Sequence, residues 1–281
     1  MAVAKTGGRL RQVKQMNRKS ILSLLAFAVG FVMTTGLNNV SGAEAATGNT
    51  TGSPVLVEFF TSEGCSSCPP ADRLLQDLDR QQPVPGASVI VLSEHVDYWN
   101  HDGWKDPFSS SLLTDRQNAY VTHFGLSSAY TPQMIVDGGA EFVGNSSQQA
   151  KAAIQKALTV NKAEVRVSSI SLDGTTLRAH VDADALPQHG PSHAEVFVVV
   201  ALNHAESQVL AGENGGRRLT HVGVVRSLTK VGRVDTQKSF DADVRLALNP
   251  SDNPANLRVV AFVQASGPGK VLGATMQPVS R

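Results

Sequence analysis

Residues 55–70, which read VLVEFFTSEGCSSCPP, decide the fold. The apolar run VLVEFF predicts a buried strand, and ADRLLQDLDR at residues 71–80 has three leucines at helical spacing. Cys65 and Cys68, the only cysteines of the 281-residue chain, lie between the two segments. A strand that ends before a CxxC pair and a helix that begins at it provide the setting that a redox pair requires.

The pattern continues as alternating strands and helices up to residue 160. A second strand, SVIVLSEHV at residues 88–96, completes a β-α-β unit, which implies parallel strands and a right-handed crossover. A helix at residues 111–124, the strands QMIVDG and AEFVG, and a helix at residues 147–158 follow. These segments predict an α/β domain over residues 55–160.

From Asn161 onward the helical period disappears. Seven short strand-like segments follow, and the turn pair Asp173-Gly174 separates the first two of them. Strands at this spacing predict a β-sandwich. The sequence therefore predicts an all-β sandwich-like domain over residues 161–281.

The first 45 residues are typical of a signal peptide. Six basic residues precede the apolar run at residues 21–37, and Ala43-Glu44-Ala45 is a small-x-small cleavage site. We expect cleavage after Ala45, followed by a linker over residues 46–54. The alternative is an uncleaved leader that anchors the protein in the membrane. Either reading predicts a periplasmic or secreted protein.

Removal of the leader changes the charge balance. Residues 1–45 hold six of the 25 basic side chains and one of the 24 acidic ones, so the remainder has 19 basic and 23 acidic residues, a net charge of about −4. A weakly acidic surface without dense stripes of lysine and arginine does not attract nucleic acid. We therefore expect no nucleic-acid partner.

The CxxC pair favours redox chemistry over a structural role. A disulfide that closes so small a loop stabilises a fold little, and a zinc site needs about four ligands, while the sequence has no second cysteine pair. The positive end of a helix dipole favours a thiolate. Cys65 is therefore predicted to attack a substrate, and Cys68 to resolve the mixed disulfide. Thr131-Pro132 precedes a strand, a position suited to a cis peptide bond.

The order of these segments over residues 54–160 resembles the thioredoxin fold. The resemblance implies that Pro132, in cis, faces the cysteine pair and that Thr131 binds substrate backbone. It also implies that Glu58 is the buried acid that assists deprotonation of the second thiol. Gly64 departs from the pattern, which usually has an aromatic residue before the first cysteine.

Several longer strings resemble one family, the secreted thioredoxin-like proteins catalogued as domain of unknown function 1223. They are VEFFTSEGCSSCPPAD, SEHVDYWNHDGWKDPF, TDRQNAY, YTPQMIVDG and GENGGRRLTHVGVVRSL. That family has no settled function, so the resemblance implies the architecture: an α/β thioredoxin-like domain followed by an all-β sandwich-like domain.

Two polar segments supply candidate substrate-binding residues. The first follows the second strand and contains His95, Asp97 and Trp99. Three interpretations of this segment stay open: it forms a wall of the substrate site, it ligates a metal, or it packs against the fold through its aromatic residues. The second holds Glu213, Arg217 and His221; it is either a solvated loop or part of a site between the two domains.

These observations predict an exported thiol-disulfide oxidoreductase with a redox-active Cys65–Cys68 disulfide and no bound cofactor. Its partners would be a protein or small-molecule thiol or disulfide substrate and a redox partner that resets the pair, with membrane contact only through a retained leader. Two alternatives stay open. One is a periplasmic copper or zinc carrier that uses Cys65, Cys68 and His95, and the other is a non-catalytic binding module with a stable bridge.

Overall fold

The computed structural model describes residues 52–279. The predicted signal peptide and residues 46–51 of the predicted linker lie outside the described residues. The elements are, in chain order, β1 (Ser53–Thr61), α1 (Pro69–Gln81), β2 (Ala87–His95), α2 (Ser111–Phe124), β3 (Gln133–Val136), β4 (Ala140–Val143), α3 (Ser147–Ala157), β5 (Val165–Asp173), β6 (Thr176–Ala183), β7 (His193–Gln208), β8 (Arg218–Asp235), β9 (Phe240–Ala247), the short 3-10 helix η1 (Pro254–Asn256), β10 (Leu257–Ala265) and β11 (Val271–Pro278).

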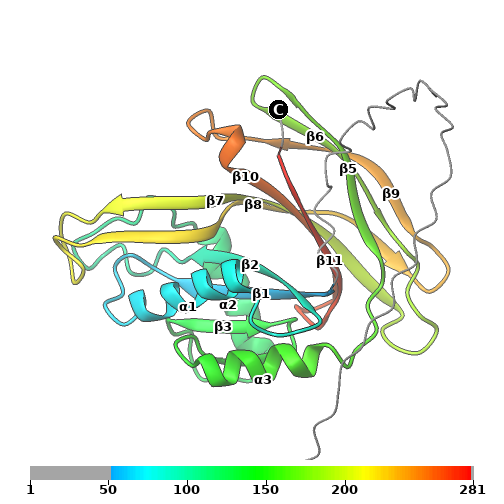
Figure 1. Cartoon of the computed structure of the whole chain (residues 1–281), viewed down its shortest axis with the longest axis horizontal. Coiled ribbons are helices and arrows are strands. Elements are labelled where there is room, and N and C mark those ends of the chain that lie inside the picture. Colours follow the sequence, from blue (N-terminus) through cyan, green and yellow to red (C-terminus); the bar gives the residue numbers. More distant parts are fainter. Residues whose placement is uncertain (1–51, 280–281) are drawn as a thin grey trace, which may run out of the picture. The chain divides into compact units, whose positions relative to one another are not determined.

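Eight strands form one mixed sheet in the order β11-β10-β7-β8-β2-β1-β3-β4, and β5-β6-β9 form a separate three-stranded sheet (Figure 1). The predicted fold class, an α/β thioredoxin-like domain followed by an all-β sandwich-like domain, is therefore wrong. The protein is mostly β, and strands from both halves of the sequence share the large sheet. The physical reason is a strand pairing that joins residues far apart in sequence.

That pairing is the parallel contact between β2 and β8, where Ser93 is the partner of Val224. Gly223 makes the close approach possible because a Cβ atom at this position would lie 2.4 Å from the carbonyl oxygen of Val91. Gly223 also has a φ of +61°, a conformation that favours glycine. The glycine thus allows β8 to extend the sheet that β1 and β2 begin.

Both faces of the large sheet are covered. Val57 and Val91 pack on α1 and α3 on one side, and Leu56 and Leu92 pack with Leu113 of α2 on the other. The three-stranded sheet packs on alternate valines of β7 and β10. Strands buried on both faces read as nearly continuous apolar runs, which explains VLVEFF in β1 and VVAFV in β10.

The helices and strands lie close to their predicted positions in the sequence. α2 has the predicted bounds, and α1 begins two residues before the predicted helix. Ser110 caps α2 through its side chain, which accepts a hydrogen bond from the backbone N–H of Leu112, and Gly125 ends the helix in a left-handed conformation. Local pattern therefore predicted the elements, while the sheet that joins them depends on long-range pairing.

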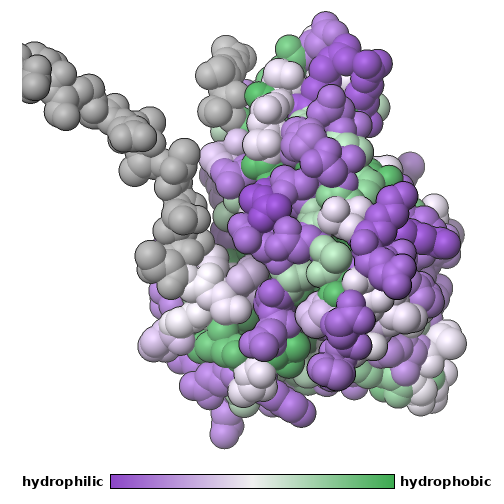
Figure 2. Space-filling model, turned by 90° about the vertical axis from the view of Figure 1, so that its right-hand side faces the viewer, coloured by the Kyte–Doolittle hydropathy of each residue, from purple (hydrophilic) through white to green (hydrophobic). Residues whose placement is uncertain are grey.

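One face of the molecule is largely polar. Figure 2 shows hydrophilic side chains over most of one face, with hydrophobic side chains in separate smaller patches. Among residues 52–279, no helix has both the length and the apolar character needed to cross a membrane.

Candidate functional site

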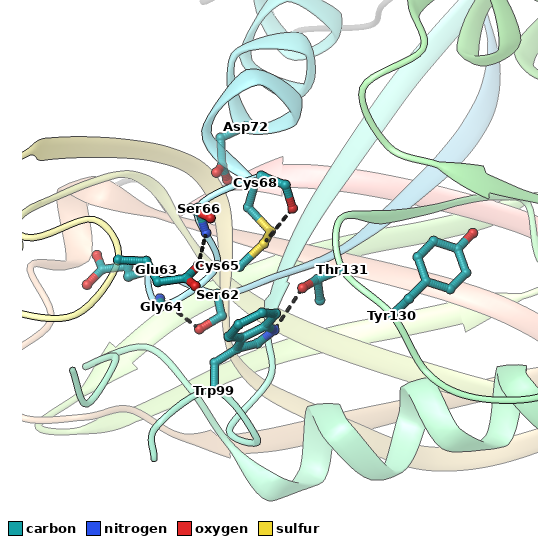
Figure 3. Close-up of a disulfide and its surroundings, with 12 residues drawn as sticks. Ser62, Glu63, Gly64, Cys65, Ser66, Cys68, Asp72, Trp99, Tyr130 and Thr131 are labelled. Carbon is teal, nitrogen blue, oxygen red and sulfur yellow. Dashed lines mark hydrogen bonds between the residues drawn. A yellow bond between two sulfur atoms is a disulfide. The ribbon is translucent and has the colours of Figure 1, made fainter. Parts of the chain in front are cut away.

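Cys65 and Cys68 are joined by a disulfide at the point where β1 leads into α1 (Figure 3). Both cysteines are fully buried, whereas Ser66 and Ser67 between them are exposed. The hydroxyl of Ser67 lies 3.3 Å from Sγ of Cys65. The sulfur atoms therefore lie directly beneath an exposed turn.

The start of α1 leaves few backbone donors near the sulfurs. The first two helical residues are Pro69 and Pro70, which have no N–H group. The backbone N–H of Cys68 donates to the carbonyl oxygen of Cys65 at 3.2 Å. Ser66 and Ser67 thus hold the backbone N–H groups that remain in this turn.

The Thr131–Pro132 peptide bond is cis. It lies beside residues 62–68, which we call the disulfide loop (Figure 3). β1 and β3 are antiparallel with Phe60 opposite Gln133, which places Pro132 next to the end of β1. Trp99 donates from its indole Nε1 to Oγ1 of Thr131 at 2.8 Å. Figure 3 shows Trp99 and Thr131 on one side of the disulfide and Asp72 on the other.

Residues 209–217, which we call the tip loop, connect β7 to β8 and pack on the disulfide loop. Glu213 accepts a hydrogen bond from the backbone N–H of Ser66 at 3.2 Å. The Asn214 amide is fully buried and donates to the carbonyl oxygens of Glu63 and Cys65, at 2.8 and 3.0 Å. The β7–β8 hairpin, yellow in Figure 1, thereby reaches the cysteine pair from the second half of the sequence.

A buried group of charged side chains lies behind the pair. His221 of β8 contacts two carboxylates, with Nδ1 lying 3.1 Å from Asp72 and Nε2 3.4 Å from Glu63. Burial alone would lower the pKa of His221, but Asp72 and Glu63 raise it to about 10. His221 is therefore a buried imidazolium at neutral pH. It links β8 to α1, because Asp72 lies in the first turn of that helix.

His95 forms the next layer of this group. Its Nδ1 lies 2.7 Å from Asp106, and its ring contacts that of His221 with centroids 4.7 Å apart. Burial would raise the pKa of Asp106, but His95 and the backbone N–H groups of Glu63 and Phe108 lower it below its usual value. The carboxylate of Asp106 also accepts a hydrogen bond from the backbone N–H of Glu63 at 2.8 Å, which fixes the segment after β2 to the disulfide loop.

Glu58 belongs to a different buried cluster. Its carboxylate contacts Nε of Arg116 and the hydroxyl of Tyr120, both at 2.5 Å. Gln264 of β10 donates to the same hydroxyl. Burial, followed by the nearby charge of Glu58, raises the pKa of Glu94 well above its usual value. Glu58 therefore has partners on α2, and the carboxylates beside the disulfide loop are Glu63 and Asp72.

Comparison with known families identifies the chain. The family described as "Protein of unknown function (DUF1223)" matches residues 56–264. The chain belongs to the DUF1223 family. The match extends from β1 into β10, so it includes the disulfide, the tip loop and His221.

Solved structures share the fold of this DUF1223 protein. Protein AGR_C_4864 from Agrobacterium tumefaciens is 26% identical with a TM-score of 0.63, and the match covers 82% of this chain and 96% of the other. HBP35 of Porphyromonas gingivalis is 17% identical with a TM-score of 0.58, and the match covers 82% of this chain and 76% of the other. A comparison with curated proteins gives no match.

Most of the predicted site residues of this DUF1223 protein lie around the disulfide. Trp99 and Thr131 contact each other beside it, Glu213 binds Ser66, and His221 and His95 lie behind it. Arg217 contacts Asn214, which in turn binds the disulfide loop: the Arg217 guanidinium donates to Oδ1 of Asn214 at 2.9 Å. Asp97 accepts a hydrogen bond from the hydroxyl of Thr114 in α2. Within residues 52–279, no three His, Cys, Asp or Glu side chains are arranged to bind a metal.

Sequence reasoning missed the acidic partners of the histidines in the DUF1223 chain. Asp72 follows Cys68 by four residues, so helical spacing alone puts it one turn beyond the pair. Glu63 is bound by the indole Nε1 of Trp104 at 2.8 Å as well as lying near His221. These two contacts of Glu63 come from the segment after β2 and from β8, which no local sequence pattern brings together.

Proposed function

We propose that the protein is an exported thiol-disulfide oxidoreductase. The Cys65 thiolate attacks a substrate disulfide, one substrate sulfur leaves as a thiolate, and a mixed disulfide forms. The Cys68 thiolate then attacks Sγ of Cys65, releases the second substrate thiolate and restores the Cys65–Cys68 bond. Run in reverse, the same steps oxidise a substrate dithiol.

The observation that carries the proposal is a disulfide at the start of a helix with a cis Thr131–Pro132 bond beside it. The helix dipole favours a negative charge on Cys65. The raised pKa of His221, which Asp72 and Glu63 cause, supports the same reading, because perturbed titratable groups gather at functional sites more often than elsewhere.

Thiol-disulfide exchange requires the contacts between the tip loop and the disulfide loop to open. Both cysteines are fully buried, and the tip loop is hydrogen-bonded to the backbone of Cys65 and Ser66, so an incoming sulfur reaches Cys65 only after local movement. The tip loop is held to the disulfide loop by hydrogen bonds from few side chains, and such contacts open at lower cost than a packed core.

Cys68→Ser protein expressed in its native compartment tests the proposal. Without the resolving thiol, covalent partners should remain attached to Cys65 through a mixed disulfide, visible as thiol-sensitive bands on non-reducing gels and identifiable by mass spectrometry. Cys65→Ser and the double variant Cys65→Ser/Cys68→Ser are the matched controls and should carry far less. Equal amounts of covalent partner in all three variants would rule the mechanism out.

The full burial of both sulfurs favours a second candidate, a non-catalytic binding module with a stable bridge. Inert structural disulfides have reduction potentials below about −300 mV, whereas exchange-active pairs lie above that value. The potential of the Cys65–Cys68 pair separates the two functions. A value below the limit would support the binding module.

A further inference from the structure

Glu213 makes a contact that the exchange reaction has to break. Its carboxylate takes the backbone N–H of Ser66, the residue that directly follows Cys65. The neighbouring Asn214 fixes the loop in place through the carbonyl oxygens of Glu63 and Cys65, and Arg217 holds the Asn214 amide from behind. The docked tip loop therefore places the negative charge of Glu213 beside Ser66 and Ser67, the turn between the two cysteines, which we call the cysteine turn.

The Ser66 N–H is a scarce donor. Pro69 and Pro70 remove the N–H groups that usually begin a helix, and the N–H of Cys68 is taken by Cys65. Besides the Ser67 hydroxyl, which lies 3.3 Å from its sulfur, a thiolate on Cys65 would therefore depend on the backbone N–H groups of Ser66 and Ser67. Glu213 occupies one of them in the disulfide form.

We propose that Glu213 is a positioning residue of the exchange reaction: its carboxylate holds the Ser66 N–H while the cysteines are bonded and yields it to the Cys65 thiolate on reduction. The inference deepens the proposed function and rests on it. In the reduction step, two thiols of a reducing partner become one disulfide and the Cys65–Cys68 bond breaks. Cys68 takes up one of the two protons, the second goes to solvent, and Cys65 keeps a negative charge.

The new charge lies close to the Glu213 carboxylate, and two like charges that compete for one donor disfavour each other. The hydrogen bonds from Ser66 lower the pKa of Glu213, which keeps this carboxylate ionised at neutral pH. Reduction therefore weakens docking of the tip loop. By thermodynamic linkage, docking of the loop makes the disulfide harder to reduce by the same factor.

Glu213→Gln tests the inference because the amide keeps the size and an acceptor oxygen but loses the charge. Equilibration with reduced and oxidised glutathione should show the equilibrium of the variant shifted about three- to tenfold toward the dithiol, where tenfold corresponds to about 30 mV. The pKa of the Cys65 thiol, followed by the ultraviolet absorbance of the thiolate, should be lower than in the wild type.

Two further variants separate charge from structure. Glu206 lies on the same hairpin, where it binds Arg218 and does not contact the cysteine turn. The redox equilibrium of Glu206→Gln should therefore match that of the wild type. Glu213→Asp keeps the charge and should stay nearer to the wild type than Glu213→Gln. Identical potentials for the wild type, Glu213→Gln and Glu206→Gln would overturn the inference.

The reduced protein provides a second readout. Backbone amides of residues 209–217 should exchange with deuterium faster in the reduced protein than in the disulfide form, and this difference should shrink in Glu213→Gln. Equal exchange in both redox states would also overturn the inference. Failure of the proposed function has a different signature, because the wild-type pair itself would then resist reduction.

Discussion

Arg116→Met should lower the free energy of unfolding by about 3–5 kcal/mol, the usual cost of leaving a buried charge without its partner. Arg116 is nine-tenths buried, and its Nε contacts the carboxylate of Glu58, which has almost no exposed surface. Methionine fills similar space but removes the positive charge. Urea unfolding followed by circular dichroism measures the change.

An exposed ion pair provides the matched control. Arg166 is about half exposed and contacts Glu164, Asp182 and Asp184, so Arg166→Met should cost no more than about 1 kcal/mol. In Glu58→Met/Arg116→Met both charges are absent, and most of the lost stability should return. If Arg116→Met and Arg166→Met lowered the free energy of unfolding equally, the buried Glu58 carboxylate would not need the charge of Arg116, and the prediction would be wrong.

The stability of the protein should fall between about pH 6.5 and pH 10 through the loss of the His221 proton. The pKa of His221 is raised to about 10 in the folded protein, while in the unfolded chain it is near 6.5. The folded state therefore holds a proton in this window that the unfolded state lacks. Its stabilising effect is complete below pH 6.5, declines by at most about 1.4 kcal/mol per pH unit above it, and is lost above pH 10.

His221→Gln isolates this effect. The difference in unfolding free energy between wild type and variant should shrink as the pH rises from 7 to 10, and His101→Gln, at an exposed position, should leave the wild-type pH profile unchanged. Parallel profiles for wild type and His221→Gln would contradict the prediction. If His221→Gln unfolds at every pH, an NMR titration of His221 in the wild type gives the same answer.

The sequence predicts the local structure of this protein well because local signals control it. Prolines at the start of α1, the Ser110 cap of α2 and the apolar runs of β1 and β2 act within a few residues. The placement of Trp99 and Glu213 beside the cysteines depends on long loops, so the sequence predicts this placement only as one alternative among several.

The shared sheet was not predicted because its decisive contact joins Ser93 to Val224. One signal was present in the sequence. The run VFVVVAL of β7 lacks the alternation of a strand with one exposed face, and β10 is buried along almost its whole length. Strands of this kind belong in the interior of a covered sheet, as β7 and β10 do, rather than in an independent sandwich with a solvated outer face.

The buried acids at the site show the same limit. The resemblance to the thioredoxin fold implies that Glu58 is the acid near the thiols, yet Arg116 and Tyr120 bind it. Asp72 and Glu63 lie beside the pair instead, and both face His221, which follows them by about 150 residues. Ion pairs between such distant residues follow from tertiary packing, which the sequence pattern does not encode directly.

Titration of the wild-type protein with a glutathione redox buffer tests the exchange chemistry of Cys65 and Cys68 most directly. The fraction of each redox state is read by alkylation of free thiols and mass spectrometry. We expect reversible interconversion with a midpoint above about −300 mV. A pair that stays oxidised down to lower potentials, while the protein remains folded, would contradict the oxidoreductase proposal and leave a structural bridge in its place.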